Sequence, residues 1–213
     1  MKYKCIIFDC DGVLVDSESI SNSTLVSMAK EIGVSIPLDF AMTHFLGKSL
    51  QFCFDYIENL APQKLPKTFE EEFRERTFEA FKTQMQPIPG VHELLSKINI
   101  PIAVASNGPA EKIRLNLTTT KLIDRFEGNI FSAYDINSWK PNPELYLHAA
   151  KSMGFAVEEC LVIEDSLAGV QAAQAGGFDV YTYVNKHTEK LFKDINVPQF
   201  NTMYQLEKLI FID

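Results

Sequence analysis

The sequence lacks the marks of a secreted or membrane-bound protein. No apolar run approaches the length of a transmembrane helix, and the apolar stretch near the N-terminus is far too short for a signal peptide. The four cysteines, Cys5, Cys10, Cys53 and Cys160, show no C-x-x-C spacing. We therefore expect a soluble, cytoplasmic protein without a membrane partner, in which the cysteines are reduced and mostly serve as packing residues.

Positive charge is also scarce in this chain. The 213 residues include 20 lysines and arginines against 28 acidic residues, which gives a formal net charge of −8 at pH 7. Nucleic-acid-binding proteins present basic surfaces, so this balance predicts no nucleic-acid partner. An anionic substrate would have to be attracted locally rather than by the whole surface. The sequence does not reveal the oligomeric state, although a monomer is favoured.

Short apolar or β-branched runs alternate with helical patterns along most of the chain. The runs cover residues 4–9, 101–106, 129–133, 160–165 and 178–183. Alternating strands and helices are typical of a parallel sheet with helices on both faces. The sequence therefore predicts an α/β fold.

Two of the helical patterns have clear expected boundaries. Asn142 is the expected N-cap of one helix, with Pro143 at its first position and Gly154 as its stop. Ser166 is expected to open the next helix, which ends near Gly176.

One interval, from Ser17 to about Gln86, contains no convincing strand. Its clearest helical pattern covers residues 69–81, where Phe69, Phe73 and Phe81 fall near one face and predict a core stripe. We interpret this interval as a helical insert that follows the first strand. The expected division is a core of residues 1–16 and 87–213 and an insert of residues 17–86.

Polar side chains stand where four of the expected strands end. Ligands of open parallel sheets bind beyond the carboxyl ends of the strands. Each side chain alone could be explained by a turn, a helix cap or a surface lysine. Together they form the set that phosphoryl transfer requires, because carboxylates hold Mg²⁺ while lysine and helix N-termini bind phosphate oxygens. The residues, in strand order, are Asp9 and Asp11, Ser106 and Asn107, Lys140, and Glu164 and Asp165.

The two aspartates of the first strand end suggest a division of labour. Hydrolysis of phosphate monoesters needs up to ~10²¹-fold acceleration, whereas a general acid or base alone supplies roughly 10² to 10⁴. Nucleophilic attack by a carboxylate beside a metal ion fills this gap. We therefore expect Asp9 to attack phosphorus and Asp11 to act as general acid and then as general base.

Four segments carry a family resemblance. "FDCDGVLVDSE", "ASNG", "WKPNPELY" and "VIEDSLAGVQAAQAGG" resemble the four motifs of the haloacid dehalogenase-like superfamily of phosphatases. The resemblance implies a Rossmann-like core with the first strand central, and a cap domain formed by the helical insert. It also implies that Mg²⁺ is held by Asp9, the Asp11 backbone carbonyl and Asp165, with Glu164 holding a metal-bound water.

The resemblance also implies the residues that bind the substrate. Phosphate would be bound by Gly12, Ser106, Asn107 and Lys140. Residues near "FLGKSL" in the cap would contact the rest of the substrate, with Lys48 and Ser49 as candidates, although the pair could also be a solvated helix start. "SNGP" and "FSAYDINSWKPNP" further resemble bacterial 6-phosphogluconate phosphatases, so a small phosphorylated sugar acid is the favoured substrate.

Three other readings are open. A receiver-type phospho-switch would need a phosphoacceptor acid at the end of the third strand, and the run at 129–133 has none there. Halide-removing members of the superfamily lack the second aspartate, which is present here as Asp11. A sugar-phosphate mutase of the β-phosphoglucomutase type is the strongest rival. Such mutases carry an arginine where this chain has Leu50, and a histidine in the first cap helix, where this chain has none.

Overall fold

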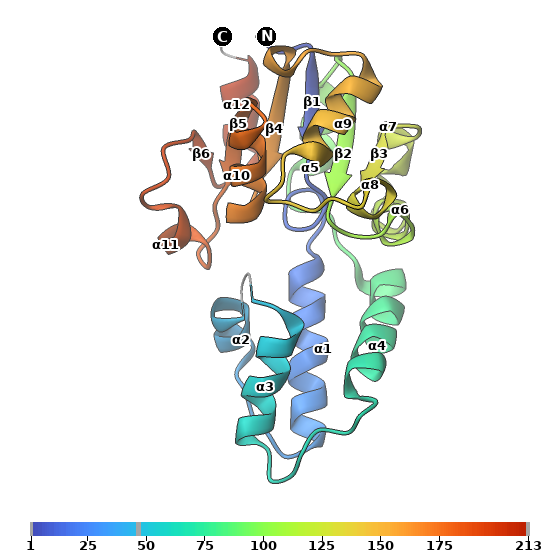
Figure 1. Ribbon diagram of the computed structural model, residues 1–213, viewed down its shortest axis with the longest axis vertical. Helices are drawn as coiled ribbons and strands as arrows, with labels where there is room; N and C mark the ends of the chain where they lie inside the picture. Colours follow the sequence, from blue (N-terminus) through green and yellow to red (C-terminus); the bar gives the residue numbers. More distant parts are fainter. Residues whose placement is uncertain (1, 46–47, 212–213) are drawn as a thin grey trace. The chain divides into compact units, whose positions relative to one another are not determined.

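The computed structural model describes residues 2–45 and 48–211. The chain forms two compact units, which are drawn in Figure 1. One unit combines the chain up to Asp16 with the chain from Gln86 onward, and the other spans Ser17–Met85. The expected division assigned Gln86 to the insert. Among the described residues, no helix has the length and apolar character needed to cross a membrane.

The larger unit is built on a six-stranded sheet in the order β3-β2-β1-β4-β5-β6. All neighbouring strands are parallel, which confirms the predicted sheet type. This order is that of Rossmann-like folds, with β1 inside the sheet between β2 and β4. The strands are β1 (Cys5–Phe8), β2 (Ile102–Ser106), β3 (Ile130–Ser132), β4 (Cys160–Glu164), β5 (Asp179–Tyr183) and β6 (Gln199–Phe200).

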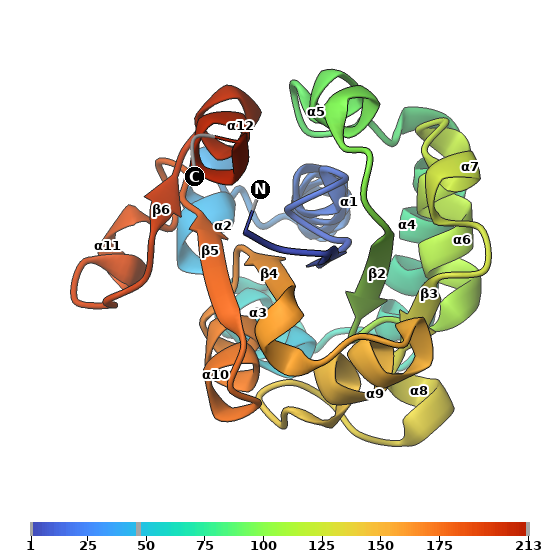
Figure 2. The same ribbon diagram turned by 90° about the horizontal axis from the view of Figure 1, so that it is seen from above.

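Helices cover both faces of this sheet, as Figure 2 shows, with α9 and α10 on one side and α5 and α12 on the other. Side chains of β1 alternate between the two faces. Cys5 and Ile7 pack in the cluster that includes α9 and α10. The Phe8 ring meets Phe126 of α7 edge-on, with centroids 6.2 Å apart. The helices are α5 (Val91–Lys97), α6 (Ala110–Thr119), α7 (Ile123–Phe126), α8 (Ala133–Ile136), α9 (Glu144–Met153), α10 (Leu167–Ala175), α11 (Glu189–Phe192) and α12 (Met203–Phe211), with a 3-10 turn at Val157–Glu159.

The helix boundaries confirm two of the sequence expectations and correct a third. Gly154 ends α9 with a φ of 79°, and the Ser166 hydroxyl caps α10 by accepting from the Gly169 amide. Asn142 is not an N-cap, because α9 begins one residue later than expected, with Pro143 in the cap position. The Asn142 amide instead donates to the Trp139 carbonyl at 2.9 Å and closes the turn before the helix.

The described residues of the smaller unit form four helices around an apolar core of their own. The predicted stripe on its last helix is confirmed, because Phe69, Phe73 and Phe81 are all buried. The Phe54 ring packs edge-on against Phe69 and Phe73. The four cysteines of the chain are free and buried in the two units. The helices of this unit are α1 (Ser17–Glu31), α2 (Leu38–His44), α3 (Leu50–Leu60) and α4 (Phe69–Gln84).

Candidate active site

Asp9 lies at the point where the order of the strands reverses. It directly follows β1, and its amide donates to the carbonyl of Ile163 in β4 at 2.9 Å. Glu164 ends β4, so the two carboxylates lie on neighbouring strands at the carboxyl edge of the sheet. The chain moves from β1 toward β3 on one side and returns beside β1 as β4, which makes this edge the expected ligand site of the fold.

Lys140 joins these two carboxylates. Its ammonium donates to Asp9 Oδ1 at 2.5 Å, to Glu164 Oε1 at 2.7 Å and to the Ala105 carbonyl at 3.0 Å. The Lys140 side chain is only 3% exposed, so it is not a surface lysine before a turn. A positive charge between two buried carboxylates relieves the repulsion that they would otherwise suffer.

Burial and charge act in opposite directions on these groups. Burial raises the pKa of Asp9 to about 7, although the Lys140 ammonium pulls it down. Burial alone would lower the pKa of Lys140, but Asp9 and Glu164 outweigh it and raise that pKa well above its usual value. Burial would raise the pKa of Glu164, yet Lys140 holds it below the ordinary range. Lys140 and Glu164 are therefore ionised at neutral pH.

The Glu164 carboxylate accepts five hydrogen bonds. Its Oε1 accepts from Lys140 and from the Tyr146 hydroxyl, the latter at 2.8 Å. Its Oε2 accepts from the Asp165 amide and from both the amide and the hydroxyl of Ser166, all at 2.9 Å. Gly169 makes room for this carboxylate, because a Cβ at that position would overlap both carboxyl oxygens. The Glu164 side chain is thus fixed in place by Lys140, by Asp165 and Ser166 before α10, and by Tyr146 of α9.

The loop after β2 is tied to Lys140 through its backbone. Asn107 Oδ1 accepts from the Lys140 amide at 2.9 Å, and Asn107 Nδ2 donates to the Lys140 carbonyl at 3.4 Å. Ser106 is buried, and its hydroxyl accepts from the Gly108 amide at 3.0 Å. Neither side chain caps α6, which begins after Pro109 without a side-chain cap. The structure therefore brings Ser106, Asn107 and Lys140 together, as the sequence predicts.

Asp11 contacts α6. Its Oδ2 accepts from Lys112 Nζ at 2.9 Å, and its Oδ1 accepts from Asn116 Nδ2 at 3.3 Å. The sequence pattern predicts neither partner, because a spacing of four residues places them on one face of α6 but does not indicate what that face contacts. The structure thus gives Asp9 and Asp11 different lysines.

Gly12 has a left-handed backbone, with a φ of 84°. A Cβ at this position would overlap the carboxylate of Asp165. Glycine therefore allows both the turn after Asp11 and the close approach of Asp165. The Tyr183 side chain lies near the same carboxylate, and burial followed by the charges of Asp16 and Asp165 raises the pKa of Tyr183.

Within the described residues, no three side chains of histidine, cysteine, aspartate or glutamate are grouped as a ready-made metal site. The carboxylates of Asp9 and Glu164 bind Lys140, while that of Asp11 binds Lys112. The donor set is nevertheless one that suits Mg²⁺, because it consists of carboxylate and carbonyl oxygens. Glu164 fits a direct metal bond poorly, because both of its oxygens already accept hydrogen bonds.

Lys48 and Ser49 lie in the smaller unit, just before α3. The Ser49 hydroxyl accepts from the Phe52 amide at 3.2 Å and caps that helix. The Lys48 ammonium lies 5.3 Å from the centroid of the Phe52 ring. Both residues are exposed, and Gly47 of the same loop lies outside the described residues.

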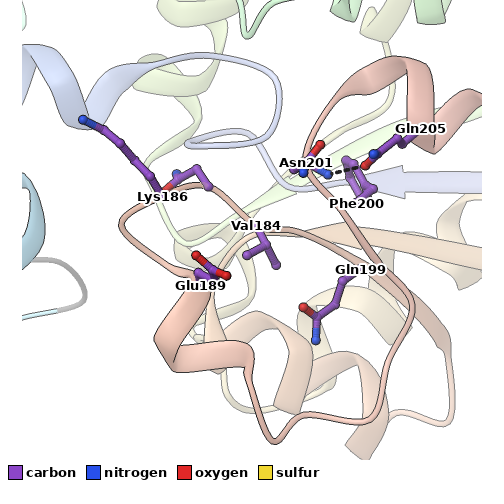
Figure 3. Close-up of a pocket in the computed structure, with 8 residues that line it drawn as sticks. Val184, Lys186, Glu189, Gln199, Phe200, Asn201 and Gln205 are labelled. Carbon is purple, nitrogen blue, oxygen red and sulfur yellow. Dashed lines mark hydrogen bonds between the residues drawn. The ribbon is translucent and has the colours of Figure 1, made fainter.

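A pocket of about 480 Å³ lies at the carboxyl ends of β5 and β6 and is shown in Figure 3. Several of its amide groups are engaged in holding the surrounding loops. Gln205 Oε1 accepts from the Asn201 amide at 2.9 Å, and Gln199 Nε2 donates to the Phe192 carbonyl at 2.9 Å. None of the residues predicted for the active site lines this pocket. Its lining residues are Val184, Asn185, Lys186, Glu189, Gln199, Phe200, Asn201 and Gln205.

The sequence and the fold match a known family. The profile of the haloacid dehalogenase-like hydrolases matches residues 6–204. The chain belongs to the haloacid dehalogenase-like hydrolases, which confirms the resemblance seen in its four motifs. It is 34% identical over 209 residues to the 6-phosphogluconate phosphatase of Escherichia coli K12, which covers 98% of this chain and 95% of that protein. Within the family, this chain is a phosphatase, a hydrolase of phosphoric monoesters.

Two further relatives support this assignment. Hexitol phosphatase B of Escherichia coli K12 is 28% identical over 174 residues, covering 79% of this chain and 78% of that protein. The crystal structure of a family hydrolase from Deinococcus radiodurans R1, which holds phosphate and sodium, superposes with a TM-score of 0.86. That hydrolase is 26% identical to this chain, and the match covers 98% of this chain and 95% of the other.

Proposed function

We propose that this protein is a Mg²⁺-dependent phosphatase that hydrolyses a small phosphorylated sugar acid through an aspartyl-phosphate intermediate. The observation that carries this proposal is Asp9, a buried carboxylate at the switch point of the sheet with a lysine fixed against it. An incoming phosphate is an anion, and Lys140 together with the proposed Mg²⁺ would supply the local positive charge that the acidic surface lacks. The favoured substrate is 6-phosphogluconate.

The proposed reaction has two displacements at phosphorus. In the first, an Asp9 carboxylate oxygen forms a bond to phosphorus while the bond to the ester oxygen breaks. The Asp11 carboxyl gives its proton to that departing oxygen, so the product leaves as an alcohol. In the second, the oxygen of a water molecule bonds to phosphorus while Asp11 takes a proton from that water. The bond between phosphorus and the Asp9 oxygen breaks, which frees the Asp9 carboxylate and inorganic phosphate.

The metal would be held by oxygen ligands around Asp9. We assign its ligands as the Asp9 and Asp165 side chains and the Asp11 carbonyl. When bound, Mg²⁺ neutralises the negative charge of the phosphoryl group. Glu164, with its five donors, keeps Lys140 and the Asp165 backbone in place, and its predicted contact with a metal-bound water stays a prediction.

The phosphate oxygens would be bound by the loop residues and Lys140. Asn107 holds the Lys140 backbone, so the lysine and the loop after β2 form one cradle. The Ser106 hydroxyl already accepts one hydrogen bond and keeps a proton to donate to a phosphate oxygen. The Gly12 amide already donates to the Val15 carbonyl at 2.8 Å, so the role of Gly12 in phosphate binding stays a prediction.

The substrate assignment rests on the relatives and on the cap. The Escherichia coli relative is named for 6-phosphogluconate, a molecule with a phosphate at one end and a carboxylate at the other. Lys48 is an exposed ammonium in the cap and would bind the carboxylate as a point charge. The Ser49 oxygen accepts the hydrogen bond that caps α3, and its hydroxyl proton would still be available to donate to the substrate.

Release of inorganic phosphate from 6-phosphogluconate tests the proposal. With Mg²⁺ the wild type should release phosphate, excess chelator should stop the reaction, and added Mg²⁺ should restore it. Asp9→Asn should abolish turnover with an unchanged circular dichroism spectrum, because an amide oxygen is a poor nucleophile. Asp124→Asn, at an exposed position on α7, is the matched control and should keep full activity. Full activity in excess chelator, or a tenth of wild-type activity in Asp9→Asn, would refute the proposed mechanism.

A further inference from the structure

We propose that Lys112 and Asn116 of α6 are positioning residues that orient the carboxyl group of Asp11 for proton transfer. This inference rests on the proposed function, in which Asp11 serves as the general acid and base. Neither residue lies in the motifs that carry the family resemblance. Their role follows from the contacts that they make with Asp11.

The two residues hold the carboxyl group of Asp11 at both oxygens. Lys112 and Asn116 lie four residues apart, so they share one face of α6. Lys112 Nζ contacts Oδ2 at 2.9 Å, and Asn116 Nδ2 contacts Oδ1 at 3.3 Å. A bond to each oxygen fixes the rotation of the carboxyl group as well as its position. The side chains of Asp11 and Lys112 are 26% and 29% exposed, so this ion pair is largely sheltered from water.

The amide of Asn116 is oriented toward Asp11 at a cost. Asn116 is fully buried, and its Oδ1 finds no hydrogen-bond partner within the described part of the chain. A buried acceptor without a partner is destabilising. The amide nevertheless directs its NH₂ group at Asp11, which is the arrangement expected if the contact serves the reaction rather than the stability of the core.

The held carboxyl group lies beside the proposed phosphate site. A Cβ at Gly108 would lie 3.9 Å from Asp11 Oδ2 and 3.4 Å from the Ser106 hydroxyl. Asp11 therefore lies next to the carboxyl end of β2, where Ser106 is. Asp9 is held separately by Lys140, so the nucleophile and the proton donor are fixed by two different cations.

Orientation of Asp11 matters because proton transfer needs close geometry. A donor must lie within hydrogen-bond reach of the departing oxygen, and a displacement of about 1 Å can cost roughly 10²-fold in rate. Lys112 and Asn116 neither give nor take the transferred proton. They set the direction from which Asp11 supplies it to the ester oxygen and later accepts it from water.

The test compares two substrates that differ in their need for a proton. Sugar alkoxides leave poorly without one, whereas p-nitrophenolate leaves without protonation. Values of kcat/KM report only the steps up to formation of the phospho-enzyme. They are therefore not affected by the later step, in which Asp11 acts as general base toward water. For Lys112→Met we expect kcat/KM to fall at least about tenfold with 6-phosphogluconate and less than about threefold with p-nitrophenyl phosphate. If 6-phosphogluconate is not hydrolysed, the sugar phosphate that the wild type hydrolyses fastest takes its place.

Three variants complete the experiment. Lys112→Arg keeps a cation beside Asp11 and should recover most of the lost activity. Asn116→Leu removes the unpaired buried oxygen, so it should keep or raise the melting temperature and still lose activity selectively with the sugar phosphate. Lys97→Met breaks a pair with Glu207 that links α5 and α12, and it should leave both substrates unaffected.

The outcomes separate this inference from the proposed function. A wild type that releases no phosphate from any monoester would refute the function itself. If the wild type is active, the positioning role alone would be refuted by a Lys112→Met variant whose kcat/KM falls equally with both substrates or does not fall with either. Asp11→Asn is the reference, because it should show the same selectivity with a larger loss.

Discussion

Glu164 is fully buried, so its negative charge must be compensated inside the protein. An unpaired buried carboxylate costs several kcal/mol, and breaking a buried pair costs about 3–5 kcal/mol. The compensation comes from Lys140, from the first residues of α10 and from Tyr146. The Tyr146 ring also lies 4.8 Å from the Lys140 ammonium, so one residue contacts both charges. Burial and the Glu164 charge raise the pKa of Tyr146 well above its usual value, so its hydroxyl keeps the proton that it donates.

Tyr146→Phe isolates the hydroxyl of this residue. The ring would remain beside Lys140, while Glu164 Oε1 would lose one of its two donors. We expect the free energy of unfolding to fall by about 2 kcal/mol, because hydrogen bonds to charged groups contribute roughly 1.5–3 kcal/mol. Urea denaturation measures the change, and Tyr134→Phe on the exposed α8 should have no effect. An unchanged midpoint for Tyr146→Phe would show that the hydroxyl does not support Glu164.

Gly169→Ala should destabilise the protein, although a glycine-to-alanine substitution within a helix usually stabilises. Glycine within a helix ordinarily costs roughly 0.5–1 kcal/mol relative to alanine, so alanine normally stabilises. Here the new methyl group would overlap the Glu164 carboxylate and displace it from Lys140. We expect destabilisation of about 3 kcal/mol and a large loss of phosphatase activity. Gly128→Ala, where a Cβ meets nothing within 4 Å, should cost only the strain of its left-handed backbone. A Gly169→Ala protein with wild-type melting temperature and turnover would contradict this account.

The sequence predicts part of the site and misses the rest for one physical reason. Asp9 and Glu164 are predictable because polar residues at the ends of apolar strands gather at one sheet edge. Lys140 lies beyond α8 rather than at a strand end, so its motif is what indicates it. Tyr146 and Lys112 are not, because each lies on a helix whose orientation depends on packing. The contact between Asp11 and Lys112 joins residues 101 positions apart, and the helical pattern alone gives no reason for it.

At the scale of elements, α4 shows how a predicted stripe becomes the core of a separate unit. Phe69 and Phe73 both contact Phe54 of α3, so the apolar face of this helix is covered within the smaller unit. Phe78 lies on the other side of the same helix and is 40% exposed. The two phenylalanines Phe73 and Phe78 therefore form a matched pair for mutation.

Phe73→Ala should destabilise the smaller unit by about 3–5 kcal/mol, because it leaves a cavity in an aromatic cluster. Phe78→Ala, in the same helix, should cost far less. Hydrogen exchange monitored along the chain measures the two effects. Faster exchange should be confined to α1–α4 in Phe73→Ala, while the strands of the larger unit keep their protection. Equal effects of the two substitutions would mean that the stripe is not a core contact.

Strand β6 could not be predicted from the sequence pattern. It contains only Gln199 and Phe200, directly after Pro198, which is too short for an alternating or continuous apolar pattern. Its pairing with β5 depends on the position of the preceding chain, as in the bond from the Thr182 amide to the Pro198 carbonyl at 2.9 Å. The five longer runs were predictable because each is long and apolar enough to fill an inner strand or its neighbour.

At the scale of the whole molecule, an acidic protein must bind an anionic substrate. The net charge of −8 disfavours long-range attraction, so binding depends on cations placed near the reaction. The larger unit supplies Lys140 and Lys112, which are both paired with carboxylates. On the proposed function, Lys48 of the smaller unit, whose ammonium lies beside the Phe52 ring, would be a further cation for the substrate.

Lys48→Ala tests the contribution of the smaller unit to binding. If Lys48 binds the carboxylate of 6-phosphogluconate, its loss should raise KM several-fold and leave kcat nearly unchanged, because the contact is the same in ground and transition states. With p-nitrophenyl phosphate, which has no carboxylate, the same variant should behave as the wild type. Lys67→Ala, at an exposed position before α4, is the control. A fall in kcat with KM unchanged would exclude the binding role.

The choice between hydrolysis and phosphoryl transfer also depends on what the smaller unit lacks. A mutase must retain a doubly phosphorylated sugar while it reorients, and arginine suits that bidentate grip. Leu50 stands at the position where β-phosphoglucomutases carry that arginine, and α1 contains no histidine. Without such a grip, water should reach the aspartyl-phosphate before a sugar returns. We therefore expect β-glucose 1-phosphate, supplied with a trace of the bisphosphate, to yield free phosphate and little glucose 6-phosphate. Rapid conversion to glucose 6-phosphate with negligible phosphate release would show that the protein is a mutase.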